Sequence, residues 1–256
     1  MKIGVTGCAG RMGKMLCQAV IEAGLELSGG TERPESSVIG QELGKGKVFA
    51  DIKELFAVSD AVLDFTAPAA SVANAKAAAE TGKVLVIGTT GLTEAQRAEV
   101  AKAAEKAPIV LAPNMSVGVN LLQALVEKVA SILDPAYDIE IVEMHHRNKV
   151  DAPSGTALAL GKAAAKGRGE SLDKVACYER HGVIGARPAG EIGFATLRGG
   201  DVVGDHTVIF AGTGERIELT HKASSRAVFA NGAVRAALWA AGQKAGLYSM
   251  RDVLGF

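Results

Sequence analysis

The residue types best suited to acid–base chemistry gather in one segment, which runs from Glu143 to Thr156. His145, His146, Arg147 and Lys149 fall within this segment, although basic and acidic residues are equally numerous in the whole chain. A cluster of this kind favours an anionic ligand. Imidazole exchanges protons near neutral pH, and an ammonium group can donate one. The segment is therefore predicted to bind an anion and to protonate it.

Ser154, Gly155 and Thr156 end this segment and open a predicted helix. Hydroxyl groups and free backbone N–H groups at a helix N-terminus suit a carboxylate, so a small dicarboxylate is the expected ligand. Other interpretations stay open for single residues: Arg147 is more typical of a surface charge, and His146 of either a substrate contact or a buried core histidine. The two histidines lack a third ligand at a suitable spacing, so no metal site is predicted.

A glycine-rich turn near the N-terminus has the spacing G-x-x-G-x-x-G, as Gly7-Cys8-Ala9-Gly10-Arg11-Met12-Gly13. Glycine lets the chain turn sharply, lets the backbone approach a pyrophosphate and lets a helix pack closely on a strand. The N–H groups of the helix that follows can then bind the phosphates. An ordinary tight turn is the alternative, but the position between the first strand and the first helix favours a dinucleotide site.

Three further stretches are expected to contact the same dinucleotide. Glu32 ends the second predicted strand and suits the ribose diol of NAD, while Arg33 suits the extra phosphate of NADP, so both NADPH and NADH are expected. A surface ion pair is the alternative for Arg33. Gly88-Thr89-Thr90 and Ala112-Pro113-Asn114-Met115 end later strands, where ligands of parallel sheets bind. Plain loop structure is an equally good interpretation of these two stretches.

The elements that position these residues alternate in the first half of the chain. Hydrophobic periodicity predicts strands over 2–6, 25–31, 61–65, 84–87 and 109–112, and helices over 12–23, 71–80 and 93–106. Thr93 and Gln96 form the pattern of a capping box at the start of the last of these helices. Short apolar strands separated by helices predict an α/β fold with a Rossmann-type, doubly wound parallel sheet.

The second half changes character. Helices are predicted over 117–133, 157–166 and 225–243, and strands over 137–145, 193–197, 207–211 and 216–221. Successive strands on short glycine-rich turns indicate a mixed or antiparallel sheet, hence an α+β domain. The last helix is expected to pack back on the first domain. The prediction is a dinucleotide-binding domain of residues 1–115 plus about 227–256, with a substrate-binding and oligomerisation domain inserted at about 116–226.

Composition excludes several classes of protein. The 256 residues have a formal net charge of zero and no basic stripe, which argues against a nucleic-acid partner. No apolar run is long enough to cross a membrane. The three cysteines, Cys8, Cys17 and Cys177, show no metal-binding or C-x-x-C spacing. A sparse, odd number of cysteines fits reduced thiols, and a cytoplasmic location is expected.

With these motifs taken together, the chain resembles the 4-hydroxy-tetrahydrodipicolinate reductase family, also called dihydrodipicolinate reductases. The segment from Glu143 to Thr156 looks like the family signature. Other segments match in order along nearly the whole chain: Gly7 to Gly13, Gly88 to Gly91, Ala112 to Asn120, His221 to Arg226, and Phe229-Ala230-Asn231-Gly232.

The resemblance implies a reduction of 4-hydroxy-tetrahydrodipicolinate, a cyclic dicarboxylate, to tetrahydrodipicolinate with loss of water, in lysine and diaminopimelate biosynthesis. It implies that His145 is a proton donor and acceptor, that Lys149 is a proton donor, and that His146, Gly155 and Thr156 bind substrate. It also implies a homotetramer joined through the substrate-domain sheets. Two other functions stay open: a Rossmann dehydrogenase of another amino-acid-derived carbonyl compound, and a dinucleotide-sensing module without turnover.

Overall fold

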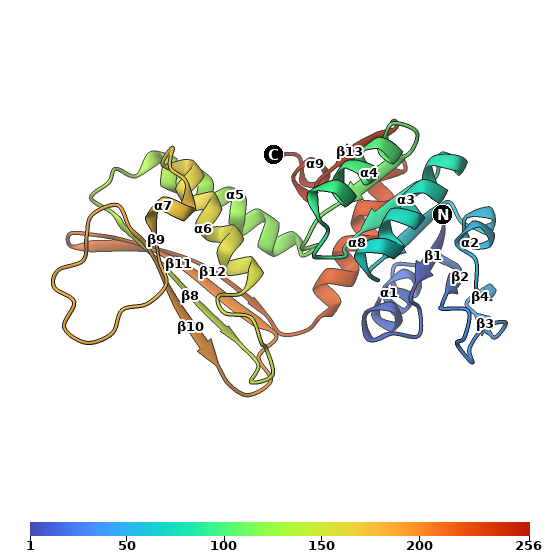
Figure 1. Cartoon of the computed structure of the whole chain (residues 1–256), viewed down its shortest axis with the longest axis horizontal. Helices are drawn as coiled ribbons and strands as arrows, with labels where there is room; N and C mark the ends of the chain where they lie inside the picture. Colours follow the sequence, from blue (N-terminus) through green and yellow to red (C-terminus); the bar gives the residue numbers. More distant parts are fainter. The chain divides into compact units, whose positions relative to one another are not determined.

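The computed structural model describes residues 1–256, and the chain divides into two compact units. The first unit comprises Met1–Val117 and Ala227–Phe256, and the second comprises Gly118–Arg226. The chain therefore leaves the first unit once and returns to complete it. Figure 1 labels the helices and strands of both units.

The first unit is built on an eight-stranded sheet with the strand order β13-β7-β6-β5-β1-β2-β4-β3. All neighbouring strands are parallel except β3 and β4. The strands are β1 (Lys2–Thr6), β2 (Glu26–Thr31), β3 (Glu42–Leu43), β4 (Gly46–Phe49), β5 (Ala61–Asp64), β6 (Val84–Ile87), β7 (Pro108–Leu111) and β13 (Gly246–Tyr248). The helices are α1 (Arg11–Glu22), α2 (Ile52–Val58), α3 (Pro68–Thr81), α4 (Glu94–Ala104), α8 (Ala227–Ala240) and α9 (Met250–Leu254).

The short apolar strands explain why this sheet lies between two helical layers. Ile3, Val5 and Leu63 are completely buried, as expected of central strands covered on both faces. One core forms between the sheet and helices α1, α8 and α9, and the other forms with α2, α3 and α4. The predicted doubly wound parallel sheet is confirmed. Helix α8 packs on α1 in this unit, as expected of the last long helix.

The strand order of the first sheet indicates where a ligand would bind. From β1 the chain proceeds to β2 and β4 on one side, and later to β5, β6 and β7 on the other side. In open α/β sheets a ligand binds outside the carboxyl ends of the strands at such a reversal. The glycine turn after β1 lies at this point.

The second unit has a five-stranded mixed sheet with the order β12-β11-β8-β10-β9. Strand β8 (Asp138–His145) lies in the centre, parallel to β10 (Ile192–Arg198) and antiparallel to β11 (Gly204–Gly212). Strand β12 (Glu215–Ala223) pairs antiparallel with β11, and β9 (Ala176–Cys177) pairs parallel with β10. Helices α5 (Val117–Ile132), α6 (Gly155–Gly167) and α7 (Leu172–Val175) lie on one face (Figure 1). The predicted mixed sheet is confirmed.

The alternation of side chains along β8 determines what faces those helices. Ile139 and Ile141 are buried in the core beneath the helices, and Glu143 and His145 continue the same face towards the end of the strand. Because successive side chains of a strand point to opposite faces, the buried row changes from apolar to ionisable without leaving the sheet. This change places the candidate site at the carboxyl end of β8.

Most predicted elements have bounds within one or two residues of those observed, and Thr93 and Gln96 do form a capping box. The elements without a prediction are short: β3, β4, α2, α7, β9, β13 and α9. A three-residue strand such as β13 has too few residues to show a periodicity, and it forms because β7 offers an edge to pair with. No helix combines the length and the apolar composition that a bilayer crossing requires.

Candidate active site

The site in the second unit is built around the carboxylate of Glu143, which is only 1% exposed. Its Oε2 lies 2.5 Å from the Nδ1 of His145, and its Oε1 accepts the backbone N–H of Ser154 at 3.0 Å. Arg198 donates to both oxygens, with N–O distances of 2.9 Å. The buried carboxylate of Glu143 is therefore hydrogen-bonded to His145, to the backbone of Ser154 and to the guanidinium of Arg198.

Strand register explains why Arg198 reaches this carboxylate. Arg198 is the last residue of β10 and pairs with His145 of β8, so its side chain shares the buried face with Glu143. The same guanidinium donates to the backbone carbonyl of Asp151 at 2.7 Å. Burial by itself would raise the pKa of Glu143, but the hydrogen bonds from Arg198, His145 and Ser154 together hold it below its usual value. Glu143 is therefore an anion at neutral pH.

His145 is 7% exposed and lies among charged groups of both signs. Burial lowers the pKa of its imidazole, the Glu143 carboxylate opposes that change, and the cationic Lys149 and Arg198 add to it. The ring of His206, from β11, meets the ring of His145 edge to face, with centroids 5.0 Å apart. Burial and the neighbouring His145 lower the pKa of His206 to about 4, so His206 is neutral at physiological pH.

The turn before α6 is fixed by Ser154. Its side-chain oxygen accepts the N–H of Ala157 as a helix N-cap, and the same oxygen lies 3.1 Å from Nε2 of His206. Gly155 is exposed, and a side chain there would meet no atom within 4 Å. Thr156 is partly buried beside it. The first turn of α6 therefore begins at an exposed glycine, and a helix N-terminus suits a carboxylate of a ligand.

Lys149 lies in the loop between β8 and α6. Its ammonium forms an ion pair with Asp151 at 2.8 Å, and its side chain is 20% exposed. The loop is held to the segment between β10 and β11 by backbone hydrogen bonds from His146 to Val202 and from Arg147 to Gly200. The Nδ1 of His146 is buried without a hydrogen-bond partner, whereas Arg147 is exposed, as expected for a surface charge.

This arrangement can bind and protonate an anion. His145 and Lys149 interact electrostatically at one strand end, and the open turn of α6 follows from the same loop. The structure thus groups the predicted residues His145, Lys149, Ser154, Gly155 and Thr156 around β8 and α6. No group of three or more histidine, cysteine or acidic residues is placed to hold a metal ion.

The glycine turn of the first unit has the geometry that each glycine was expected to supply. Gly7 has a positive φ of 59°, and Gly10 is the extended N-cap of α1. A Cβ at Gly13 would lie 2.0 Å from the carbonyl oxygen of Gly7, so the first turn of α1 packs directly on the loop. The N-terminus of α1 can therefore accommodate a phosphate group close to the backbone.

Next to this turn lies a cavity of about 690 Å³, which is lined by Gly7, Gly10, Glu32 and Arg33 among others. The Glu32 carboxylate accepts the N–H of Ala9 at 2.9 Å and so joins the end of β2 to the turn. Arg33 is exposed. A cavity with backbone N–H groups at one side and a carboxylate at the other fits the phosphates and the ribose of a dinucleotide.

Other predicted cofactor residues do not line that cavity. In the glycine turn, Cys8 is buried, and burial raises the pKa of its thiol to about 11. Ala9 and Arg11 are exposed, and Met12 is half-buried.

The two later strand ends are mostly packed within the first unit. Thr89 is buried, and its hydroxyl oxygen accepts hydrogen bonds from the Thr66 N–H and the Ser71 hydroxyl. Gly88 packs against the ring of Phe65, while Thr90 is exposed. Ala112 and Met115 are buried, Pro113 is exposed, and Asn114 accepts the N–H of Ser116.

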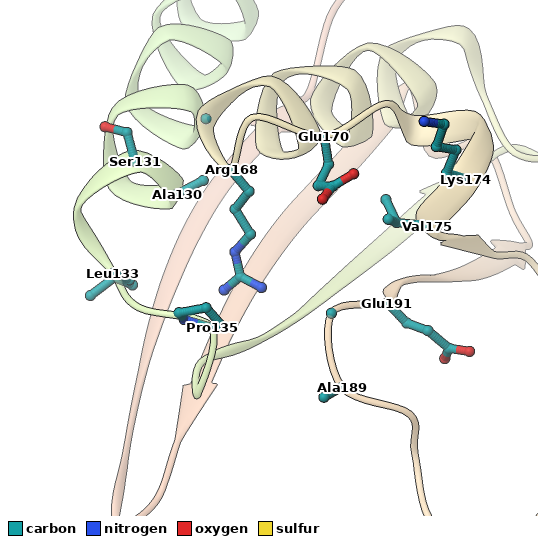
Figure 2. A pocket seen from close by; sticks show the side chains of 12 residues that line it. Ala130, Ser131, Leu133, Pro135, Arg168, Glu170, Lys174, Val175, Ala189 and Glu191 are labelled. Atoms are coloured by element: carbon teal, nitrogen blue, oxygen red, sulfur yellow. The ribbon is translucent and has the colours of Figure 1, made fainter.

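A separate cavity of about 530 Å³ lies in the second unit, beside the ends of α5 and α6 (Figure 2). Arg168 extends along it and donates to the backbone carbonyl of Tyr137. Glu170, Lys174 and Glu191 also line it, so charges of both signs are present. It contains none of the predicted site residues.

Sequence reasoning missed three contributors to the site in the second unit. Glu143 lies in the segment that carries the predicted residues, but its pattern predicts no role for it, because an alternating strand residue is more often part of a sheet face than of a site. Arg198 and His206 are distant in sequence, and only the register of β10 and β11 with β8 brings them to it. The one available signal was that His206 and Arg198 lie in strands whose apolar residues alternate along the same face as they do.

Comparison with known proteins covers nearly the whole chain. The family model described as dihydrodipicolinate reductase, N-terminus, matches residues 1–115, and that described as dihydrodipicolinate reductase, C-terminus, matches residues 118–254. A 4-hydroxy-tetrahydrodipicolinate reductase of Rhodopseudomonas palustris (strain BisB18) is 54% identical over 264 residues, covering 100% of this chain and 97% of the relative. The relative of the same name from Thiobacillus denitrificans is 53% identical over 263 residues, covering 100% and 98%.

A solved structure gives an independent view of the fold. The dipicolinate-bound dihydrodipicolinate reductase from Paenisporosarcina sp. TG-14 superposes with a TM-score of 0.81 at 23% sequence identity, covering 97% of each chain. At this identity the likeness concerns the fold, and it includes both units described above.

Proposed function

The chain belongs to the dihydrodipicolinate reductase family, and we propose that it reduces 4-hydroxy-tetrahydrodipicolinate to tetrahydrodipicolinate, with loss of water, using NADPH or NADH. The reaction belongs to lysine and diaminopimelate biosynthesis. The observation that carries the proposal is the cluster at the end of β8, where a buried, carboxylate-held histidine lies near a lysine and an open helix N-terminus. A carbonyl dehydrogenase or a dinucleotide sensor has no evident need for this cluster.

Each residue of the cluster has a proposed part. The turn of Ser154, Gly155 and Thr156 binds one carboxylate of the substrate through backbone N–H groups and hydroxyls. His146 and the ammonium of Lys149 bind the rest of the dianion. Hydride addition to a conjugated imine leaves electron density that must be protonated, and His145 and Lys149 are the proton donors in reach of this loop.

The first unit fits a dinucleotide, which supplies the hydride when bound. The residues proposed to hold it are those of the glycine turn with Glu32 and Arg33, together with two strand ends at the same edge of the sheet: Gly7, Cys8, Ala9, Gly10, Arg11, Met12, Gly88, Thr89, Thr90, Ala112, Pro113, Asn114 and Met115. Support comes from the close packing of Gly13 on Gly7 and from the cavity between the turn and Glu32. Dual use of NADPH and NADH follows from Glu32 and Arg33 standing side by side.

The proposed domain roles follow the same division. Residues 1–115 and about 227–256 bind the dinucleotide, and residues of about 116–226 bind substrate and join subunits into a homotetramer. The helices of the second unit cover one face of its sheet, which leaves the other face for a second copy. A cytoplasmic location belongs to the proposal as well, and it agrees with three free cysteines.

The direct test is a steady-state assay. Enzymatically made substrate is added to the protein with NADPH or NADH, and the absorbance band of the reduced nicotinamide is followed. We expect substrate-dependent oxidation that falls on the order of 10²–10⁴-fold in kcat for His145→Gln and for Lys149→Ala, the usual worth of general acid catalysis. Dinucleotide affinity should stay nearly unchanged in both variants.

The same assay separates the alternatives. A sensor binds the dinucleotide without oxidising it when substrate is present. If His145 and Lys149 only bind the carboxylates, KM rises while kcat holds, and the assigned proton transfer is then wrong. Oxidation that requires a semialdehyde instead of the cyclic substrate would favour another Rossmann dehydrogenase.

A further inference from the structure

We propose that Glu143 and Arg198 are a positioning pair for proton transfer: Arg198 fixes the Glu143 carboxylate, which orients the ring of His145 and anchors the turn at Ser154. The inference deepens the proposed function and rests on it, because it takes His145 to be the group that exchanges the proton. Neither residue needs to touch the substrate. Both would act through His145 and through the first turn of α6.

The hydrogen bonds leave the carboxylate no freedom to rotate. Each oxygen accepts one bond from Arg198 at 2.9 Å, and each has one further partner, His145 at 2.5 Å or Ser154 at 3.0 Å. A forked guanidinium matches a carboxylate in a single plane. The proton-exchanging ring and the carboxylate-binding turn are thereby held to one rigid group, so their separation is set before substrate arrives.

The pair also determines which nitrogen of His145 exchanges protons. The Glu143 carboxylate is an anion, as argued above, and can only accept, so the Nδ1 of His145 carries a hydrogen. The Nε2 is then the nitrogen left for exchange. A Cβ at Gly204 of β11 would lie 2.9 Å from that Nε2, so glycine leaves room beside the reactive atom. The geometry points to Nε2 as the donor.

The ionisable groups around His145 come from β8, β10, β11, β12 and the loop after β8. Glu143 on β8 is the one anion in contact, Arg198 on β10 and Lys149 in the loop are cations, and His206 on β11 is neutral. His221 on β12 lies opposite His206, and burial lowers its pKa as well. Without Glu143, burial and two cations would oppose a protonated imidazole unchecked. The carboxylate is therefore what keeps an acid form of His145 available.

Arg198 also makes a hydrogen bond to the loop between β8 and α6, so one guanidinium contacts both the carboxylate of Glu143 and this loop. It donates to the carbonyl of Asp151, whose carboxylate is paired with Lys149. Arg198 thus connects β10 both to the proposed histidine donor, through Glu143, and to the segment that carries the lysine. A positioning role for Arg198 predicts that its geometry matters more than its charge.

The decisive measurement is the pH dependence of kcat for Glu143→Gln, at saturating substrate and dinucleotide. Glutamine keeps the shape but removes the charge, so protonated His145 is less favourable. An acid is active below its pKa, so the limb on which activity falls with rising pH should move to lower pH, by about one pH unit or more. The limb in question is the one that His145→Gln abolishes.

Glu140→Gln is the matched control. Glu140 is also a β8 carboxylate paired with arginines, Arg180 and Arg187, but it lies on the opposite face of the strand. Its replacement removes a similar ion pair and should leave the limb in place. An equal displacement in both variants, or no displacement in Glu143→Gln, would overturn the proposal, because a purely structural ion pair changes stability and not the limb.

Arg198→Lys separates geometry from charge. Lysine keeps the positive charge but not the fork, so the limb should stay near its wild-type pH while kcat falls on the order of 10²-fold from misplacement. Full kcat in this variant would refute the role of Arg198.

If Glu143→Gln does not fold, ¹⁵N NMR of histidine-labelled wild-type protein tests the orientation of the ring directly. A His145 without hydrogen on Nδ1 contradicts the proposal.

The pH profiles distinguish a wrong proton donor from a wrong positioning pair. If His145→Gln keeps every limb of the profile, His145 is not the acid and the proposed function loses that residue. If His145→Gln abolishes a limb that Glu143→Gln leaves unmoved, the reaction assignment stands and the positioning pair is wrong.

Discussion

Glu32 and Arg33 stand next to each other at the end of β2, yet their surroundings differ. The Glu32 carboxylate is engaged with the N–H of Ala9, whereas the Arg33 side chain is exposed and makes no hydrogen bond or ion pair within the protein. A free guanidinium beside a cavity that fits a ribose is available to a 2′-phosphate. Glu32 is thus already bonded to the glycine turn, whereas the guanidinium of Arg33 has room for a phosphate contact.

Replacement of Arg33 by alanine should therefore weaken NADPH more than NADH. The lost charge-assisted contact is worth about 1.5–3 kcal/mol, which corresponds to roughly a 10- to 150-fold rise in Kd for NADPH alone. Fluorescence titration with each dinucleotide measures both constants. Arg97→Ala, on α4 of the same unit, controls for the change in net charge. Equal losses for the two dinucleotides would remove the phosphate contact from Arg33.

At the level of residues, the sequence could predict what lies close together along the chain. His145, Lys149 and Ser154 belong to one loop, so their types and spacing already suggested a common site. The pairing of Arg198 with His145 depends on strand register instead, and a slip of one residue would place Leu197 there and turn Arg198 to the other face. No single-sequence pattern specifies that register, so the Glu143–Arg198 pair became visible only in the fold.

Among the helices and strands, α8 illustrates how packing overrides intrinsic preference. Gly232 lies inside this helix, and a Cβ there would come within 1.8 Å of the carbonyl oxygen of Met115. Alanine normally stabilises a helix by up to about 1 kcal/mol relative to glycine, whereas overpacking a buried contact costs roughly 1–3 kcal/mol. Because the neighbour is backbone and cannot turn away, the collision should dominate.

Gly232→Ala should consequently lower the stability of the protein and displace the loop that ends in Met115, a proposed cofactor contact. Thermal unfolding and dinucleotide titration measure the two effects. Asn231→Ala is the control, because this exposed neighbour in α8 gains helix propensity without a collision. A stabilised Gly232→Ala variant with unchanged affinity would show that α8 shifts without consequence for the site.

Elements were predictable where a periodicity had room to develop. The strands of the first sheet and the helices α1, α4, α5 and α6 follow directly from apolar spacing, glycine stops and caps. Strands β3, β4 and β13 are short and exist through pairing with a neighbour that only the fold supplies. The parallel pairing of β8 with β10 is likewise a property of topology, since α6 and α7 lie between these strands along the chain.

For the whole molecule, the second unit raises the question of what meets the uncovered face of its sheet. Helices pack on the row that includes Ile141 and Phe210, while Val142, Ile209 and Leu197 point to the opposite face. Leu197 is 49% exposed in the single chain. On this face Ile209 lies between Glu140 of β8 and Glu218 of β12, so apolar and charged side chains are mixed, a composition that occurs at interfaces between subunits.

If this face joins the subunits of the proposed homotetramer, Leu197→Lys should break the assembly. Leu197 pairs with Met144 of β8, so a lysine at this position has no carboxylate directly opposite it in the strand pair. Burying that lysine at an interface removes its hydration, which costs several kcal/mol and is repeated in every copy. Sedimentation velocity should then report a smaller species for Leu197→Lys than for the wild-type protein.

Leu247→Lys is the matched control, because Leu247 is an exposed leucine of strand β13 in the other unit, and its replacement should leave the mass unchanged. A Leu197→Lys protein of wild-type mass would place the subunit interface elsewhere on the chain. A reduced mass with intact dinucleotide binding would show that the first unit keeps its ligand site without the assembly.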